Sequence, residues 1–318
     1  NGSEQRLITS SDNSTYDDYI RFNSDDTISI GYRNAVVIKT NRKFRDSSGY
    51  YNIVVKVDTD QVTVNNRIIL YVNGIDERVN GYSTDSLPGQ GLTGYLNYNV
   101  TYIGVTNPTA NSNHFNGIMS YINFTDAYAY DASAFGSTDS TTGEWQINTS
   151  PSVTYGNNGF FILKNGNTIT DQSGEGNNFT LGGGTLTNTL DCPSNVFATL
   201  NSLNYTSSAI TYSNGNTKAT YPGAWMASQG TIGALTGKYY WEAKVNSGNN
   251  ANLFYGISIS QIDLDTAPQN KAGVISQHIA GDRYVDTVYT ASAAETFSNG
   301  NILGVALDLD SATKTVKF

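Results

Sequence analysis

The sequence predicts an all-β protein made of two tandem antiparallel β-sandwiches. The chain has 318 residues, enough for two domains of about 150 residues that each have their own core. Asn, Ser, Thr, Gly and Tyr dominate it, with 31 Gly and 22 Tyr, whereas helical proteins are rich in Ala, Leu, Glu and Lys. Apolar and polar residues alternate in short segments, which Gly, Asn, Ser and Asp turns separate.

Residues 51–74 are predicted to form a hairpin. The apolar face of its first strand consists of Tyr51, Ile53, Val55 and Val57. Its second strand carries Ile68, Leu70 and Val72 on one face. Asn73-Gly74 follows directly, and this pair tolerates the positive φ angles of a tight turn.

A similar unit is expected near the end of the chain. A half-buried strand is predicted from the alternation of Tyr239, Trp241, Ala243 and Val245 with polar neighbours. Residues 302–318 then give a strand that ends in Asp308 and Asp310, a polar loop and a second strand. Because 53–74 has the same order, we expect two related sandwiches rather than one large sheet.

The alternation indicates where the domains lie. It fades after about residue 135 and returns near Phe197. We therefore predict a first sandwich over 1–140, an ordered connecting strap over 141–195 and a second sandwich over 196–318. The strap is rich in aromatic and apolar runs such as 159–163, which indicates edge strands rather than a floppy linker.

Charge and composition exclude several classes of partner. The net charge is −9, which argues against binding to nucleic acid or anionic lipid, since both need a basic face. No apolar run reaches about 18 residues, so we predict no membrane insertion. The single cysteine, Cys192, allows no internal disulfide, and two histidines cannot build a multi-histidine metal centre. The composition suits contact with uncharged polar ligands or other chains.

Several motifs resemble known domains. YYNIVVKVD (50–58), RIILYVNG (67–74), FNGIMSYINFTD (115–126) and SAFG (133–136) resemble the central hairpin, last core strand and exit of a laminin-G-like, concanavalin-A-like jelly roll. GKYYWEAKV (237–245), YGIS (255–258) and GVALDLD (304–310) resemble a SPRY domain. This tandem, joined through 136–145, is similar to tailed-bacteriophage proteins that are assigned to tail fibres or other virion appendages.

The resemblance implies a structural and adhesive role. It implies two jelly rolls, both incomplete in this chain, so that an exposed sheet edge would need another chain to cover it. It places the protein on the surface of a virion. Its expected partners are further copies of itself, as a homo-oligomer of which the trimer is the usual form, other virion proteins, and a host surface glycan or protein.

Enzymatic chemistry finds little support in the sequence. Glycoside hydrolysis needs two facing carboxylates, and no Glu has the Glu-x-Asp-x-x-Glu neighbourhood of β-glucanases. The closely spaced acids Asp58/Asp60, Asp263/Asp265 and Asp308/Asp310 lie at strand ends or turns, where acids normally bond the backbone. His114 and His278 lie in polar loops, and no Gly-x-Ser-x-Gly elbow is present. We therefore predict a non-enzyme with no catalytic residues.

A calcium site is predicted within DQSGEGNN (171–178). Asp171, Ser173 and Asn177 present oxygen atoms along a glycine-rich turn, which is the donor set that hard cations prefer. The segment also resembles the Asp-x-Ser-Gly-x-Gly-Asn turn at the start of laminin-G-like domains. The alternative is an ordinary turn in which Asp171 and Asn177 bond the backbone.

Tyrosine-rich turns are the candidate sugar-binding residues. Aromatic faces stack on the C–H surfaces of sugars, while Asn, Asp and Gly groups bond the hydroxyls. The candidates are Tyr82, Tyr95, Tyr98 and Tyr102 beside Asn97 and Asn99, then Tyr128 and Tyr130, and Trp225 near Tyr221. The alternative is that these rings pack in strands or interfaces. By the SPRY resemblance, the loops 246–254 and 263–289 are further candidates.

These observations together predict a non-enzymatic component of a phage particle. It would present rigid loops to a host surface glycan or protein, and repeated copies would strengthen weak contacts. Two alternatives stay open. One is a decoration protein of capsid or tail with no receptor, and the other is a polysaccharide-degrading enzyme.

Overall fold

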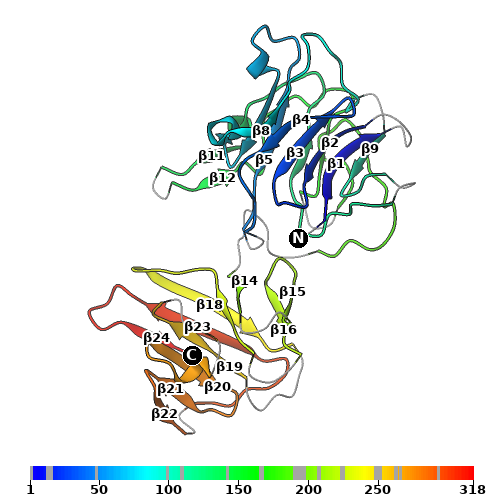
Figure 1. Ribbon diagram of the computed structural model, residues 1–318. Coiled ribbons are helices and arrows are strands. Elements are labelled where there is room, and N and C mark those ends of the chain that lie inside the picture. Colours follow the sequence, from blue (N-terminus) through cyan, green and yellow to red (C-terminus); the bar gives the residue numbers. More distant parts are fainter. Residues whose placement is uncertain are drawn as a thin grey trace. The chain divides into compact units, whose positions relative to one another are not determined.

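The computed structural model is all-β, as the sequence predicts (Figure 1). It describes residues 3–318 except 12–16, 47–48, 98–99, 108–110, 141–142, 165–167, 189–197, 206–208, 223–225, 247–252, 261–263, 265–266 and 292–293. The chain divides into two compact units, Asn1–Val196 and Phe197–Phe318. Within the described ranges no helix has the length and apolar character needed to cross a membrane. The jelly-roll topology stays a prediction.

A six-stranded antiparallel sheet forms one layer of the first unit, in the order β8-β4-β3-β2-β1-β9. Its strands are β1 (Gln5–Ser11), β2 (Asp17–Phe22), β3 (Ile28–Tyr32), β4 (Ala35–Thr40), β8 (Tyr82–Asp85) and β9 (Val100–Ile103). Arg33 and Asn34 both have positive φ, at 51° and 67°, and turn the chain between β3 and β4.

The predicted hairpin forms a second sheet of this unit. The strands are β5 (Ile53–Val57), β6 (Ile68–Val72) and β7 (Ile75–Asp76), with the 3-10 helices η1 (Val64–Asn66) and η2 (Glu77–Asn80) beside them. β5 pairs with β6, and Asn73-Gly74 turns the chain from β6 into β7. Both residues have positive φ, at 50° and 77°, so the backbone expected of this pair is confirmed.

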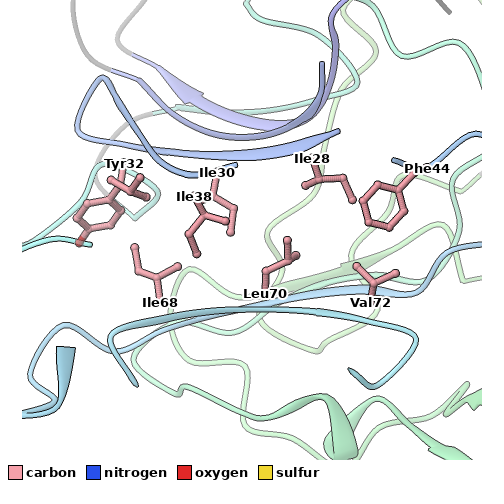
Figure 2. Close-up of a cluster of buried hydrophobic side chains, with 9 residues drawn as sticks. Ile28, Ile30, Tyr32, Ile38, Phe44, Ile68, Leu70 and Val72 are labelled. Carbon is pink, nitrogen blue, oxygen red and sulfur yellow. The ribbon is translucent and has the colours of Figure 1, made fainter. Parts of the chain in front are cut away.

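Apolar side chains from the two sheets meet in one core (Figure 2). Ile28, Ile30 and Ile38 face the side chains of β6, and Figure 2 shows the two layers with their side chains pointing toward each other. Ile68, Leu70 and Val72 are fully buried there. The apolar face predicted for the first hairpin strand packs against the same core, through Tyr51, Ile53, Val55 and Val57.

The following segment adds short strand pairs to the first unit. The pairs are β10 (Ile122–Phe124) with β13 (Phe160–Ile162), and β11 (Gly136–Thr138) with β12 (Trp145–Ile147), and η3 (Ala132–Ala134) precedes β11. Within 115–126, which resembles a core strand, only Ile122–Phe124 is a strand. Tyr121, with φ of 52°, breaks the extended backbone just before β10.

Trp145 anchors the β11–β12 hairpin to the second sheet. Its indole N–H donates to Asn52 Oδ1 over 3.0 Å. A Cβ atom on Gly74 or on Gly136 would lie 2.1 Å or 2.6 Å from the indole ring. Only glycine at these two positions leaves room for the ring, and Gly74 also needs its positive φ.

The second unit contains a three-stranded and a four-stranded sheet. These are β18 (Lys238–Lys244), β23 (Ile302–Asp308) and β24 (Thr315–Lys317), and then β19 (Phe254–Ser258), β20 (Val274–His278), β21 (Arg283–Val285) and β22 (Val288–Thr290). The remaining elements are β14 (Leu200–Tyr205) with β17 (Ser228–Gly230), β15 (Thr211–Ser213) with β16 (Lys218–Thr220), and η4 (Pro268–Asn270). Tyr255 of β19 meets Phe318, just after β24, edge to face at 5.2 Å.

The alternation of apolar and polar residues predicted for β18 holds except at Tyr239. Trp241 and Ala243 are half-buried, and Val245 is buried just beyond the strand. Tyr240, Glu242 and Lys244 are exposed. Tyr239 is also exposed, so the prediction was wrong there. Its hydroxyl donates to the Thr236 carbonyl over 2.9 Å, which turns the ring back toward the preceding turn.

Leu70→Ala should lower the free energy of unfolding of the first unit by about 2–5 kcal/mol, because it leaves a cavity in the core between the two sheets. Val79→Ala is the matched control, since Val79 is 75% exposed and its truncation should change stability by less than about 0.5 kcal/mol. Urea denaturation followed by circular dichroism measures both. Equal effects of the two variants would contradict the assigned core.

Candidate functional site

The predicted sugar-binding residues fall in different places. Tyr98 and Trp225 lie outside the described residues. Tyr102 lies in β9 directly opposite Thr9, and Thr9 lies opposite Tyr19 of β2. Because directly opposed residues share a sheet face, Tyr102 belongs to the row across the six-stranded sheet that faces away from the core. That row is a sheet surface, whereas Tyr128 and Tyr130 lie in the loop that follows β10 (Ile122–Phe124).

Tyr95 lies in a loop that the buried Asp18 carboxylate holds in place. Asp18 accepts backbone hydrogen bonds from Arg33, Tyr95 and Leu96, the last at 3.1 Å. Burial raises the pKa of Asp18, while these three bonds act in the opposite direction. The Tyr95 ring lies beneath the Arg33 guanidinium, 5.1 Å from its centroid. The Asp18 hydrogen bonds and the Arg33 contact therefore hold the loop that continues to Asn97 in place.

Asp126 ties three loops together. Its Oδ1 accepts a hydrogen bond from the Asn97 side-chain amide. Its Oδ2 accepts from the Asn158 backbone N–H at 3.1 Å and from the Asn158 side-chain amide at 3.2 Å. Its own N–H donates to the Tyr155 carbonyl over 2.6 Å. One carboxylate thus joins the loop after Tyr95, the loop before Tyr128 and the turn before β13.

Two tyrosines follow Asp126 and have different surroundings. Their rings stack with centroids 6.2 Å apart and an interplanar angle of 21°. Tyr130 is held from behind, because its hydroxyl accepts the Thr154 N–H at 2.9 Å and its ring meets Phe135 edge to face. Tyr128 is 48% exposed, and its carbonyl accepts a hydrogen bond from the Thr125 hydroxyl at 2.7 Å. Tyr130 therefore supports the Tyr128 ring, which stays open to solvent.

The backbone between Asp126 and Tyr128 is strained. Ala127 has φ of 63°, in the left-handed region that costs an L-residue roughly 1–2 kcal/mol. This conformation reverses the chain after Asp126 and sends it on to Tyr128. We call the group Asn97, Asp126, Tyr128, Tyr130 and Asn158 the Tyr128 surface. Its members can stack on an apolar face and bond hydroxyl groups, which is the chemistry of sugar recognition.

Part of this surface escapes sequence reasoning. Tyr128 and Tyr130 are predicted from their residue type, and Asn97 from its place beside Tyr95. Asp126 and Asn158 are not predicted as binding residues, since 32 residues separate them and the motif that ends at Asp126 points to a core strand rather than to a site. The only local signal is the turn sequence Asn157-Asn158-Gly159. Sugar binding by the predicted residues stays a prediction.

The predicted calcium residues are brought together, but protein donors surround the carboxylate. Asp171 Oδ1 accepts the N–H groups of Phe161 and Ser173, at 2.8 and 2.9 Å. Oδ2 accepts the Ser173 hydroxyl at 2.7 Å and the Asn177 N–H at 2.9 Å. A carboxylate offers about four acceptor positions, so this turn uses all of them. This geometry is that of an ordinary turn in which Asp171 bonds the backbone, the alternative to a calcium site.

The other acids have ordinary structural partners. Glu77 is fully buried and pairs with Arg42 at 2.7 Å. Asp308 accepts the N–H groups of Asp310 and Ser311 and pairs with Lys238. Asp310 accepts the Gly237 N–H at 2.7 Å. Asp263, Asp265 and Cys192 lie outside the described residues. In the part of the chain that the structure describes, no three His, Cys, Asp or Glu side chains gather into a metal-binding group.

Comparison with known proteins assigns this chain to no family. No family model, no curated protein and no solved structure matches it. The likeness to laminin-G-like and SPRY domains therefore stays a prediction that rests on the quoted motifs. The binding chemistry of the chain rests on its own side chains.

Asp171→Asn should lower the free energy of unfolding by about 1–3 kcal/mol at pH 7, because an amide nitrogen cannot accept the bonds that the carboxylate accepts. Burial raises the pKa of Asp171, but the hydrogen bonds from Phe161, Ser173 and Asn177 outweigh it and leave the pKa below its ordinary value. The stabilisation is therefore complete above pH of about 4 and is lost as the pH falls through the lower folded-state pKa.

The test compares the denaturation of wild type and Asp171→Asn between pH 7 and pH 2. Glu175→Gln is the control in the same turn, where Glu175 is exposed. A deficit in Asp171→Asn that stays constant down to pH 2 would contradict the assignment. The same proteins decide on calcium, because a heat of calcium binding that Asp171→Asn abolishes would establish the cation site.

Ala127→Gly should raise the free energy of unfolding by about 0.5–1 kcal/mol, because glycine adopts the left-handed conformation without strain. Ala129→Gly is the matched control two residues away, where φ is not positive, and there the extra backbone freedom should lower stability slightly. Thermal denaturation of the three proteins measures the difference. Destabilisation by Ala127→Gly would refute the strain.

Proposed function

We propose that this chain is a non-enzymatic adhesion component of a tailed-phage particle, a tail fibre or similar appendage. Its first unit binds a host surface glycan at the Tyr128 surface. The binding is contact rather than chemistry: a sugar ring stacks on the exposed Tyr128 ring, and its hydroxyls bond the polar groups beside it. The assignment to a phage particle follows from the resemblance of the motifs.

One observation carries the glycan proposal. Tyr128 keeps nearly half of its surface exposed although Tyr130 stacks behind it and a strained Ala127 fixes the backbone in front of it. A tyrosine that served only to fill a core would be covered. Strain that the surrounding contacts maintain is common at binding sites. The Asp126 bonds to Asn97 and Asn158 supply a rigid polar rim.

The particle would turn a weak contact into firm attachment. A single stacked ring with a few hydrogen bonds supports only modest affinity. In a homo-oligomer, for which we propose a trimer, each copy raises the effective concentration of the others at the host surface. Other virion proteins would hold the oligomer in place. The proposed location is therefore the outer surface of the particle.

Tyr128→Ala should weaken binding to host surface polysaccharide about tenfold, which corresponds to roughly 1.4 kcal/mol for the lost stacking. Tyr240→Ala is the matched control, because Tyr240 is 65% exposed and lies in β18 of the second unit, outside the candidate loops. Biolayer interferometry on immobilised polysaccharide measures both.

Equal binding by the two variants would refute the site. Absence of binding by the wild-type oligomer on a glycan array would refute glycan adhesion and leave a decoration protein as the better description. Release of reducing sugar from the polysaccharide would overturn the non-enzymatic assignment.

A further inference from the structure

We infer that the Tyr128 surface selects neutral, hydroxyl-rich sugars and rejects sugars that carry carboxylate or sulfate groups. This inference rests on the proposed function and names its ligand class. Three features of the first unit support it: the charge of Asp126, the pairing of Lys56 with Asp131, and the hydrogen-bonding groups that remain at the rim.

The charge of Asp126 has no cationic partner in the part of the chain that the structure describes. Its three hydrogen bonds come from the Asn97 side chain and from the backbone and side chain of Asn158, all of which are neutral groups. Neutral donors spread a negative charge without cancelling it. An anionic sugar stacked on Tyr128, two residues away, would therefore meet a like charge at short range.

Lys56 reaches the same segment of the chain but is already paired. Asp131 follows Tyr130 directly and accepts the Lys56 ammonium at 2.9 Å and the Tyr71 hydroxyl at 2.9 Å. The hydrogen bond from Lys56 holds the pKa of Asp131 below its ordinary value, so this carboxylate is ionised at neutral pH. Lys56 therefore offsets Asp131 and offers no free positive charge to a ligand.

The remaining hydrogen-bonding capacity fits hydroxyl groups. Asn97 gives one amide N–H to Asp126, and an asparagine side chain has two N–H groups and a carbonyl oxygen. Donor and acceptor thus lie next to each other on one amide. A sugar hydroxyl both donates and accepts, so it can use both, whereas a carboxylate or sulfate can only accept. Asp126 has about one of its four acceptor positions left. A sugar hydroxyl can donate to that position, whereas a carboxylate or sulfate cannot.

The charge of the whole chain acts in the same direction. The net charge of −9 repels an anionic polysaccharide at long range, and this repulsion weakens as salt is added. Binding of a neutral glycan has no such component. The two ligand classes therefore differ in whether their affinity responds to salt as well as in the affinity itself.

The experiment uses the full chain and acidic bacterial surface polysaccharides, each printed on an array both as isolated and after reduction of its uronic acids to neutral sugars. Reduction keeps the linkage and removes the charge. We expect the reduced form to bind at least tenfold more tightly. We also expect its affinity to be the same at 50 and 500 mM NaCl, while the residual affinity for the acidic form rises with salt.

Two variants locate the effect. Asp126→Asn should narrow the difference between the reduced and acidic forms at least threefold. Glu175→Gln, which removes an exposed acid from another turn of the same unit, should leave the difference unchanged. Thermal melting checks that both variants are folded, and the salt response of the wild type tests the inference without any variant.

The outcomes separate the two proposals. Binding that depends on Tyr128 but favours the acidic form, or that weakens with salt, overturns the selectivity and leaves glycan adhesion standing. A complete lack of Tyr128-dependent binding to either form overturns the proposed function itself, and the selectivity with it. Stronger binding of the reduced form that Asp126→Asn leaves unchanged contradicts the role assigned to Asp126.

Discussion

Burial of one face of β6 against strands β3 and β4 is the constraint on which the first unit depends. Burying an aliphatic side chain stabilises a protein by about 1.5–3 kcal/mol, and Ile68, Leu70 and Val72 are all fully buried. A slip of one residue in register would turn all three to solvent. The two sheets are therefore fixed relative to each other within this unit, and single carboxylates such as Asp18 and Asp126 can then hold loops through bonds of about 3 Å.

The sequence predicts those strands whose two faces differ. β5, β6 and β23 form as expected, and β6 alternates cleanly between fully buried and half-buried residues. The N-terminal strands β1 and β2 were not predicted, for two physical reasons. A bulge between Arg6 and Ile8 breaks the period of β1, and the face away from the core is polar yet buried. Arg6 stacks on the Tyr19 ring there, at 3.7 Å from its centroid, so that charged residues occupy positions that composition alone assigns to loops.

The candidate site likewise has features that the local sequence predicts and features that only the completed fold brings together. An exposed tyrosine is visible in the sequence, but the partners that make it a surface come from loops about 30 residues apart, and their meeting depends on the completed fold. The sign of φ at Ala127 is equally invisible, since alanine carries no preference for the left-handed region. The Asp171 turn shows the converse: its residues are local, and only the donors around the carboxylate distinguish a turn from a cation site.

The Trp145 anchor has a practical consequence for engineering. The indole is fixed by Asn52 and by the two glycines that make room for it, and the β11–β12 ladder ends with Thr138 opposite Trp145. Beyond this pair, the Asp139 N–H donates to the Glu144 carbonyl over 2.8 Å, and the Gly143 N–H donates to the Asp139 carbonyl over 2.9 Å. Foreign peptides grafted between Asp139 and Glu144 would leave the Trp145 packing intact, since surface turns tolerate insertion far better than packed strands. The hairpin thus offers an attachment point for an epitope or a dye.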